Sequence, residues 1–414
     1  MAFSWSTSGH SVLKLNIRLL CLFGMWPLCD SPLYNFYSAL VLTLGVWNCM
    51  EGALTVGYSG ADLEETNLVL INSFTTCSGL AKGIPFVWDR QQYYAMAHRL
   101  NALVSKQSEA CSKDTTMADI LQNPRKRASR VSLAIFLSLV VQSIVWFPMP
   151  LILHPGERRL PLVQHYRAGN NTYYALSYVV QCRAANHVCH ISVGMDCLLA
   201  TVMILVAAQL KVVTIGIAAL SSEQADTELG VKYRFEGSHA SSQNTLYRDL
   251  CLCIESHQQI LRFVKDLQRL MDPIAMTQFV FSVLAACMAL FQATYSTELA
   301  AVFQCVAFLP VPGGQVFLYC WAAHSVTEEH DPQKEWDVTY GCQRAEAVST
   351  AGYSCSWVGS SAAFKRVLRL LLCRAQKRLV FTAGYCYPID RAAFLLLVNA
   401  SYSYYALLGQ KNGR

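Results

Sequence analysis

The chain has 414 residues, of which 53% are hydrophobic and 14% charged, and its formal net charge is +6. Soluble domains carry about 25% charged residues, so this composition argues against a soluble enzyme, and the ordinary glycine and proline counts of 22 and 13 exclude a collagen-like or low-complexity chain. A polytopic membrane protein remains, in which the position of the charges matters more than their sum.

Residues 1–30 make a poor signal peptide. Trp5 and Lys14 precede a short apolar run that ends at Trp26 and Pro27, whereas a signal peptide has a charged start, a longer apolar stretch and a small-residue cleavage site. We expect this segment to form a cytosolic helix at the membrane surface.

Seven segments then approach the length of about 20 apolar residues that crosses a bilayer. They are residues 34–57, 66–88, 131–153, 188–208, 271–294, 300–324 and 384–408. Glu51 and Lys82 lie near the ends of the first two, where their side chains are expected to snorkel to water. Pro310, Pro312 and the two glycines after them predict a kink in the sixth. The predicted fold is all-α, with seven transmembrane helices.

The basic residues predict the orientation. Of the 33, 25 lie before the first span or in the connections after the second, fourth and sixth, and six lie on the opposite side. The positive-inside rule therefore gives a cytosolic amino terminus and an extracellular carboxyl terminus. G-protein-coupled receptors have the opposite orientation, and Asp89-Arg90-Gln91 follows the second span here rather than the third, so that alternative is disfavoured.

The last span carries a narrow polar stripe. At helical spacing Asn399, Ser403, Leu407 and Gln410 share one face of an otherwise apolar helix. Such a stripe faces a partner helix or water rather than lipid. Two readings stay open: a helix contact within one subunit, or a pore lining in which Leu407 forms an apolar constriction and Gln410 a ring of neutral amides at the mouth.

The carboxyl-terminal sixty residues resemble the end of insect odorant receptors. The resemblance rests on Tyr353 and Trp357 ahead of a basic helix, on the runs 374–377 and 382–384, and on Ser-Tyr-Ser-Tyr at 401–404. The wider superfamily ends in Thr-Tyr, five apolar residues and Gln-Phe, and this chain departs from that form in two places. A gustatory-receptor-like channel is the nearest alternative, but gustatory receptors keep that form more closely and this chain lacks it.

The resemblance implies an odorant receptor subunit of a ligand-gated, nonselective cation channel, located in the plasma membrane of a sensory neuron dendrite. It implies a tetramer with the co-receptor Orco, in which Leu407 is the gate, Gln410 the pore mouth, and Asn399 and Ser403 part of the pore face. Lys411 follows Gln410 where relatives usually have an apolar residue. Four such cations at one mouth would repel permeant cations, which favours a mixed channel over a homotetramer.

The segment before the last span is the candidate for assembly. Lys365, Arg366 and Arg369 share one side of a predicted helix that follows Tyr353 and Trp357. By resemblance these five residues belong to a cytosolic anchor that packs the subunits together, while a basic helix against anionic lipid is a compatible reading. The expected division of the chain is 1–30 amino-terminal segment, 31–324 ligand-binding bundle, 325–383 anchor, and 384–414 pore helix and tail.

The resemblance also implies a small pocket for neutral volatile molecules between the outer halves of spans two, three, four and six. The candidate lining residues are Phe74, Gln142, Trp146, Met149, Ile191, Met195, Phe303 and Phe308. None is charged, so recognition by shape and dispersion is expected, with Gln142 a hydrogen-bonding partner. Ordinary packing between helices is the alternative for each of them.

The remaining motifs are few. Asn170 begins a glycosylation sequon in the loop predicted to be extracellular, and Cys182 and Cys189 are candidates for a disulfide on that side. The cysteines form no metal-binding pattern, and no nucleophile–base pair or phosphate loop is found. We therefore expect no cofactor, no metal, no nucleic-acid partner and no enzymatic activity.

Overall fold

The computed structural model describes residues 7–26, 31–58, 63–111, 115–153, 156, 160–161, 171–221, 242–296, 299–329, 347–355, 357–377 and 379–412. Its elements in chain order are η1 (Thr7–His10), α1 (Lys14–Leu22), α2 (Pro32–Tyr58), α3 (Leu63–Trp88), α4 (Arg90–Cys111), α5 (Thr115–Trp146), α6 (Met149–Leu153), α7 (Asn171–Ala218), η2 (Ala219–Ser221), α8 (Ser242–Tyr295), α9 (Leu299–Phe308), α10 (Pro310–Glu329), α11 (Ala347–Ser354), α12 (Ala362–Ala375), β1 (Thr382–Ala383), β2 (Tyr387–Pro388) and α13 (Arg391–Asn412).

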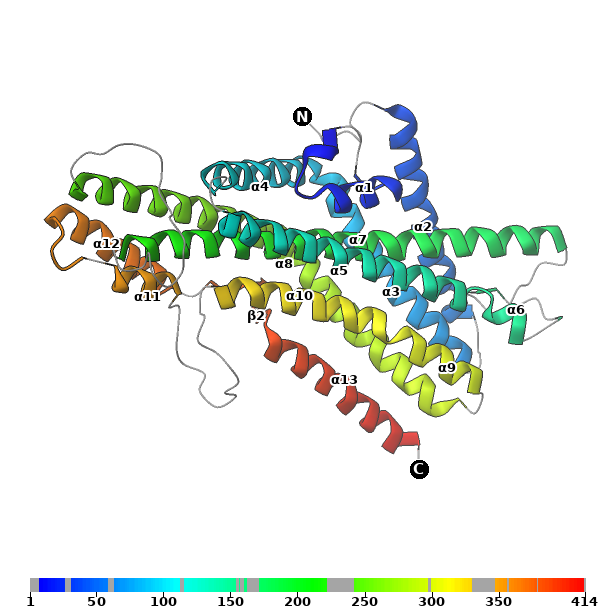
Figure 1. Ribbon diagram of the computed structural model, residues 1–414. Helices are drawn as coiled ribbons and strands as arrows, with labels where there is room; N and C mark the ends of the chain where they lie inside the picture. The colour runs from blue at the N-terminus through cyan, green and yellow to red at the C-terminus, as the bar shows by residue number, and fades with distance from the viewer. Residues whose placement is uncertain are drawn as a thin grey trace.

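The long helix α7 forms the centre of the bundle. It contacts α2, α3, α5, α8 and α10, and near one end it also contacts α11. Figure 1 shows α7 and α8 running along the long axis of the molecule, with α11 and α12 at one end and α6 at the other. The helix α13 lies along the edge of the bundle, against α8 and α10.

Five helical segments are long and apolar enough to cross a membrane by length and composition. They are Pro32–Gly57, Asp119–Ile152, Tyr173–Ala218, Leu246–Thr294 and Val302–Thr327. The two other predicted spans correspond to α3 and α13, with 26 and 22 residues. At 1.5 Å per residue, both exceed the roughly 30 Å of a hydrocarbon core. The prediction of an all-α, polytopic membrane protein is confirmed.

Proline positions explain two interruptions. The third predicted span ends as a helix at Trp146, two residues before Pro148, and α6 begins one residue after that proline. The sixth is divided at Leu309 into α9 and α10, directly before Pro310. Proline lacks an amide donor and disfavours the helical conformation in the residue before it. The kink predicted in the sixth span is confirmed.

A glycine allows α3 and α7 to approach closely. A β-carbon built on Gly79 would lie 2.8 Å from the carbonyl oxygen of Val188 on α7, which no real side chain tolerates. Small residues serve this purpose between membrane helices, where close backbone approach supplies the packing energy. The contact holds α3 against α7 at the level of the cavity described below.

The amino-terminal helix α1 packs on the same central helix. Leu13, Ile17 and Leu20 are fully buried, and the Asn16 side-chain amide donates to the Thr201 hydroxyl of α7 over 2.7 Å. The segment is thus part of the folded bundle. Its place at a membrane surface stays a prediction.

Candidate functional site

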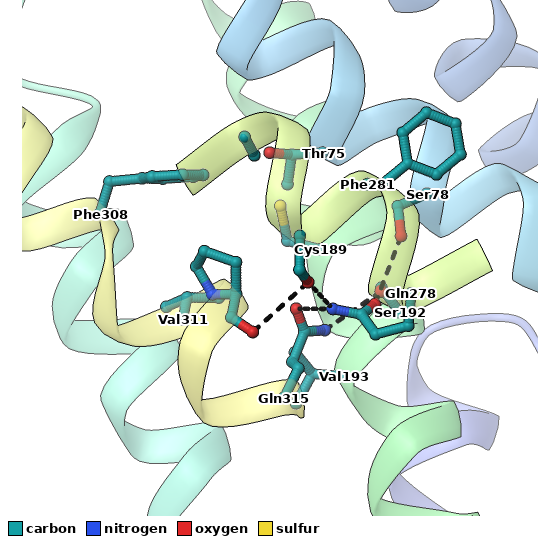
Figure 2. Close-up of a pocket in the computed structure, with 13 residues that line it drawn as sticks. Thr75, Ser78, Cys189, Ser192, Val193, Gln278, Phe281, Phe308, Val311 and Gln315 are labelled. Carbon is teal, nitrogen blue, oxygen red and sulfur yellow. Dashed lines mark hydrogen bonds between the residues drawn. The ribbon is translucent and has the colours of Figure 1, made fainter. Parts of the chain in front are cut away.

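A small cavity lies between α3, α7, α8 and the broken helix α9–α10. Its volume is about 30 Å³. Figure 2 shows residues of all these elements around one space, with Phe308, Phe281 and Thr75 on its upper side and Ser192, Gln278 and Gln315 below. The lining residues are Thr75, Ser78, Cys189, Ser192, Val193, Gln278, Phe281, Ser282, Ala285, Phe308, Val311, Pro312 and Gln315.

An ion pair lies directly beneath this cavity. The Lys82 ammonium of α3 is 2.8 Å from both carboxylate oxygens of Asp196 on α7, and neither side chain has any exposed surface. A buried pair is tolerated only when further hydrogen bonds satisfy the remaining donors and lone pairs. In this bundle such bonds come from the residues around it.

Four polar side chains complete the network. Lys82 also donates to the Ser192 hydroxyl over 3.0 Å and to the Gln278 amide oxygen. Asp196 accepts from the Gln315 amide over 2.8 Å and from the Tyr319 hydroxyl over 2.8 Å. The network therefore ties together α3, α7, α8 and α10, one helix for each side of the cavity.

The prediction that Lys82 snorkels to water is wrong. The carboxylate of Asp196 and the polar groups around it hold the ammonium inside the bundle, so it has no need of solvent. Sequence reasoning also missed Asp196, Gln278 and Gln315. The signal was present, because a lone lysine and a lone aspartate in two apolar segments are expected to face the bundle interior and pair.

Aromatic and aliphatic side chains close the cavity on the other side. Phe308 packs against Trp146 with ring centroids 5.8 Å apart, and Phe281 against Phe74 at 6.2 Å. Trp146 and Phe308 belong to a cluster with Leu68 and other residues of α3, α8 and α9, onto which Phe74 packs. The cavity thus has a polar floor and an apolar, aromatic roof.

The predicted ligand-binding residues fall into three groups. Phe308 lines the cavity, and Phe74 and Trp146 stand one layer behind it. Gln142 and Met149 are half-buried on α5 and α6. Ile191 and Met195 belong to the large central core rather than to the cavity lining, and Phe303 is 57% exposed. A ligand role stays a prediction for all eight.

The helix α13 has one packed and one uncovered side. Phe394 meets the Phe317 ring of α10 edge to face at 5.5 Å, and Leu397 is half-buried. Asn399, Ser403 and Leu407 are exposed, Leu407 by 63%. These are three of the four residues in the predicted polar stripe; the side chain of Gln410 lies outside the described residues. Their role in a pore stays a prediction.

A second, larger cavity lies between α13 and the helices α8 and α10. It has a volume of about 360 Å³ and is lined mostly by apolar side chains, with Phe394 and Leu397 among them. Ser282 and Pro312 line both cavities. The wall between the small cavity and the space behind α13 is therefore shared by one residue of α8 and one of α10.

A short hairpin precedes α13, so the predicted start of the last span at residue 384 is wrong. Strands β1 and β2 pair antiparallel, and Gly384 and Tyr385 between them adopt left-handed φ values of 62° and 56°. The carboxylate of Asp272 on α8 accepts from the Tyr385 amide at 2.9 Å and from the Thr382 hydroxyl at 3.0 Å. The helix begins at Arg391 because the chain first completes this turn.

The predicted anchor residues lie on and before α12. Ser361 caps this helix by accepting from the Phe364 amide over 3.2 Å, and Phe364, Leu368 and Leu371 form its buried side. Tyr353 is 70% exposed, and its carbonyl accepts from the Trp357 indole over 3.1 Å. Arg366 and Arg369 are exposed, whereas Lys365 is half-buried and donates to the Val358 carbonyl over 3.0 Å. Their role in assembly stays a prediction.

Two smaller predictions meet the structure differently. Cys182 and Cys189 are free thiols seven residues apart on α7. The rise of about 10.5 Å between them exceeds the separation that a disulfide can bridge, so this candidate pair does not form one. Asn170 lies outside the described residues.

Within the described part of the chain, no group of three or more histidine, cysteine, aspartate or glutamate side chains is placed to hold a metal.

Comparison with known families identifies one match over most of the chain. A family model described as 7tm Odorant receptor matches residues 62–332 and 339–402. Odorant receptor Or2 of Anopheles gambiae is 28% identical over 183 residues, 44% of each chain. Odorant receptor 10 of Aedes albopictus is 30% identical over 172 residues, 42% of this chain and 41% of that one. The matched part spans less than half of these two relatives.

A solved structure has the same fold over nearly the whole chain. The insect olfactory receptor OR5 from Machilis hrabei, in complex with eugenol, superposes with a TM-score of 0.76. The match covers 96% of this chain and 97% of that one, at 18% sequence identity. At this identity the similarity concerns the fold.

Proposed function

Since this chain belongs to the insect odorant receptor family, a family of multi-pass membrane receptors, we propose that it is the odorant-binding subunit of a ligand-gated, nonselective cation channel. In this proposal it assembles with the co-receptor Orco in the plasma membrane of a sensory neuron dendrite. The amino terminus is cytosolic and the carboxyl terminus extracellular, as the distribution of basic residues predicts.

The ligand site is the cavity beneath Phe308 together with the aromatic cluster around Trp146. A volume of about 30 Å³ admits a water molecule, whereas sites for small organic ligands occupy about 300–1,000 Å³. Odorant binding therefore requires the rings of Phe281 and Phe308 to move aside. The ligand then selects the conformation in which they have moved, which is how binding energy becomes a conformational signal.

One observation supports the coupling to a pore more than any other. Ser282 and Pro312 line both the small cavity and the space behind α13. An odorant that displaces this wall presses on the packed side of α13, where Phe394 and Leu397 lie. The opposite side of the same helix presents Asn399, Ser403 and Leu407 to neighbouring subunits or to water. A shift of α13 then moves Leu407 off the pore axis.

The remaining roles follow from that arrangement. Gln410 stands one turn beyond Leu407 and provides a neutral ring at the pore mouth, which discriminates little between cations. Tyr353, Trp357 and the basic side of α12 hold the cytosolic ends of the subunits together. Four copies of Lys411 at one mouth would repel cations, so the working channel contains Orco as well.

The test is an odorant panel applied to cells that express this chain with Orco, Orco alone, or neither. We expect inward cation currents to some odorants only when both chains are present. In the Trp146→Ala variant the potency ranking should change, with the best ligand weakened about tenfold by loss of an aromatic contact. Leu137→Ala on the same helix is the control, because Leu137 is 57% exposed.

Two results would contradict the proposal. Equal currents with and without Orco would contradict the proposed assembly with Orco. No current to any odorant, despite both chains reaching the cell surface, would remove the receptor function itself.

A further inference from the structure

We infer that the polar floor of the small cavity is a subsite for a hydrogen-bond donor, so that neutral odorants bearing an O–H or N–H group are preferred over those that only accept. The inference rests on the proposed function, because it concerns the ligand of the same cavity. Most donors of the floor are already engaged in hydrogen bonds, and several of its oxygens keep unused lone pairs.

The nitrogen donors of the floor are already engaged. Lys82 donates to Asp196, Ser192 and Gln278. The Gln278 amide donates to the Ser282 hydroxyl over 2.6 Å and to the Gln315 oxygen over 3.0 Å. The Gln315 amide donates to Ser192 over 3.2 Å and to Asp196 over 2.8 Å. A ligand carbonyl or ether would have to displace one of these bonds to find an N–H group.

Most hydroxyl protons are engaged as well. Thr75 donates to the Ile71 carbonyl over 2.9 Å, as a threonine inside a helix usually does. Ser78 donates to the Gln278 oxygen over 3.3 Å, and Ser282 to the Pro312 carbonyl over 3.4 Å. Each of these hydroxyls lines the cavity and has two lone pairs.

The acceptors are in surplus. Each hydroxyl accepts up to two bonds and each amide oxygen two, yet Ser282 and the Gln315 oxygen accept one apiece in the described network. Thr75 and Ser78 act there only as donors. Four cavity-lining oxygens therefore keep lone pairs that a donor can use.

Ser192 is the exception, and it favours the same ligands. Its oxygen accepts from Lys82 and Gln315, and among the described cavity-lining hydroxyls it is the one whose proton has no acceptor within the network. An alcohol can therefore donate to Thr75 or Ser78 and accept from Ser192. A ketone or ether can use only the second of these, together with the weak thiol donor of Cys189.

Charge excludes ions from the same subsite. Lys82 and Asp196 neutralise each other 2.8 Å apart, so the floor has polarity without net charge. A protonated amine or a carboxylate would find neither charge free to pair with it, inside an apolar bundle where an unpaired charge is costly. The ligand class that fits this cavity is a neutral molecule with an apolar body and one hydrogen-bond donor group. The apolar body packs against Phe281 and Phe308.

The test uses matched probes on cells that express this chain with Orco: phenol and anisole, cyclohexanol and methoxycyclohexane, 1-octanol and methyl heptyl ether. Leaving buried lone pairs without a donor weakens binding by about tenfold or more. We expect the alcohol or phenol of each active pair to have the lower half-maximal concentration by that factor.

Two variants locate the effect. The double variant Thr75→Val and Ser78→Ala removes acceptors without touching the ion pair, and Gln278 keeps Lys82 as a donor to its oxygen. It should reduce the preference within each pair to less than about threefold, because the response to the alcohol or phenol weakens. Thr76→Val is the control, because Thr76 is also buried, makes the same bond to the helix backbone, and does not line the cavity.

The outcomes separate the two proposals. Ethers as potent as their alcohols would overturn the donor subsite, and a preference that survives the double variant would overturn its placement at Thr75 and Ser78. Either result leaves the receptor function standing. The receptor function would be contradicted instead if the chain reaches the surface with Orco and neither these probes nor the wider odorant panel evokes a current.

Discussion

The helices α7 and α13 solve the problem of membrane burial in opposite ways. In the most apolar stretch of α7, 83% of the residues are buried within the bundle, and its aspartate has partners on α3 and α10. In α13, Phe394 and Leu397 pack inward while Leu407 remains 63% exposed. The charge of Asp196 on α7 is balanced within one chain, whereas Asn399 and Ser403 on α13 are exposed.

The contrast separates folding from function. A helix whose polar groups are satisfied by its own chain contributes to stability and has little freedom to move. A helix held on one side can shift without breaking the core, which is what a gate requires. Substitutions on α7 should therefore act on folding, and those on the uncovered side of α13 on current.

The largest expected effect follows from breaking the ion pair at α7. Lys82→Met leaves Asp196 buried without its countercharge, which costs about 3–5 kcal/mol out of a total stability of about 5–15 kcal/mol. We expect most of the protein to be retained inside the cell and the surviving fraction to melt at a lower temperature in detergent. Surface labelling and a thermal melt of the purified protein measure both.

A matched control is provided by a second ion pair. Arg99 and Asp266 approach to 2.6 Å but are 63% and 45% exposed, so Arg99→Met should cost no more than about 1 kcal/mol. Equal losses for the two variants would mean that the buried ion pair at α7 contributes no more to stability than an exposed one.

The sequence predicted the helices better than their polar contacts. Apolar runs give the spans, and Pro310 gives the break between α9 and α10, because length and proline chemistry are local properties. The pairing of Lys82 with Asp196 joins residues 114 positions apart, so it depends on which helices meet and at what depth. Local patterns do not contain that information.

The hairpin before α13 escaped prediction for a local reason. The length of the apolar segment suggests a span from residue 384, yet Gly384 and Tyr385 take left-handed φ values, which tyrosine rarely adopts. Asp272 and Gln268, more than a hundred residues earlier in the chain, hold that turn in place. For the cavity, the sequence indicated Phe74, Trp146 and Phe308, while its polar floor appeared only when four helices were brought together.

A smaller effect is expected at the hairpin of β1 and β2, which packs on α8 and precedes α13. Asp272 is buried, and one of its oxygens accepts from Gln268, Thr382 and Tyr385 at 2.9–3.0 Å. Asp272→Ala leaves these donors unsatisfied and should cost about 1–3 kcal/mol. Because the hairpin connects α12 to α13, we also expect a lower odorant-evoked current per channel at the surface.

The conservative variant distinguishes these effects. Asp272→Asn retains an acceptor oxygen and should recover most of the stability and current. If Asp272→Ala melts normally and conducts normally, the hairpin does not hold the start of α13.

The smallest effect on folding, and the sharpest test of the contrast, comes from two leucines of α13. Leu407→Ala removes an exposed side chain, so stability should change by no more than about 0.5 kcal/mol, while the resting current with Orco should rise because the apolar constriction is widened. Leu397→Ala, on the half-buried side, should cost about 1–2 kcal/mol, less than a fully buried leucine, without raising that current. Melting temperatures of the purified complexes and whole-cell currents without odorant give both quantities. If the resting current rises for Leu397→Ala and stays unchanged for Leu407→Ala, the uncovered side of α13 is not the pore face, and the difference between the two helices is one of packing alone.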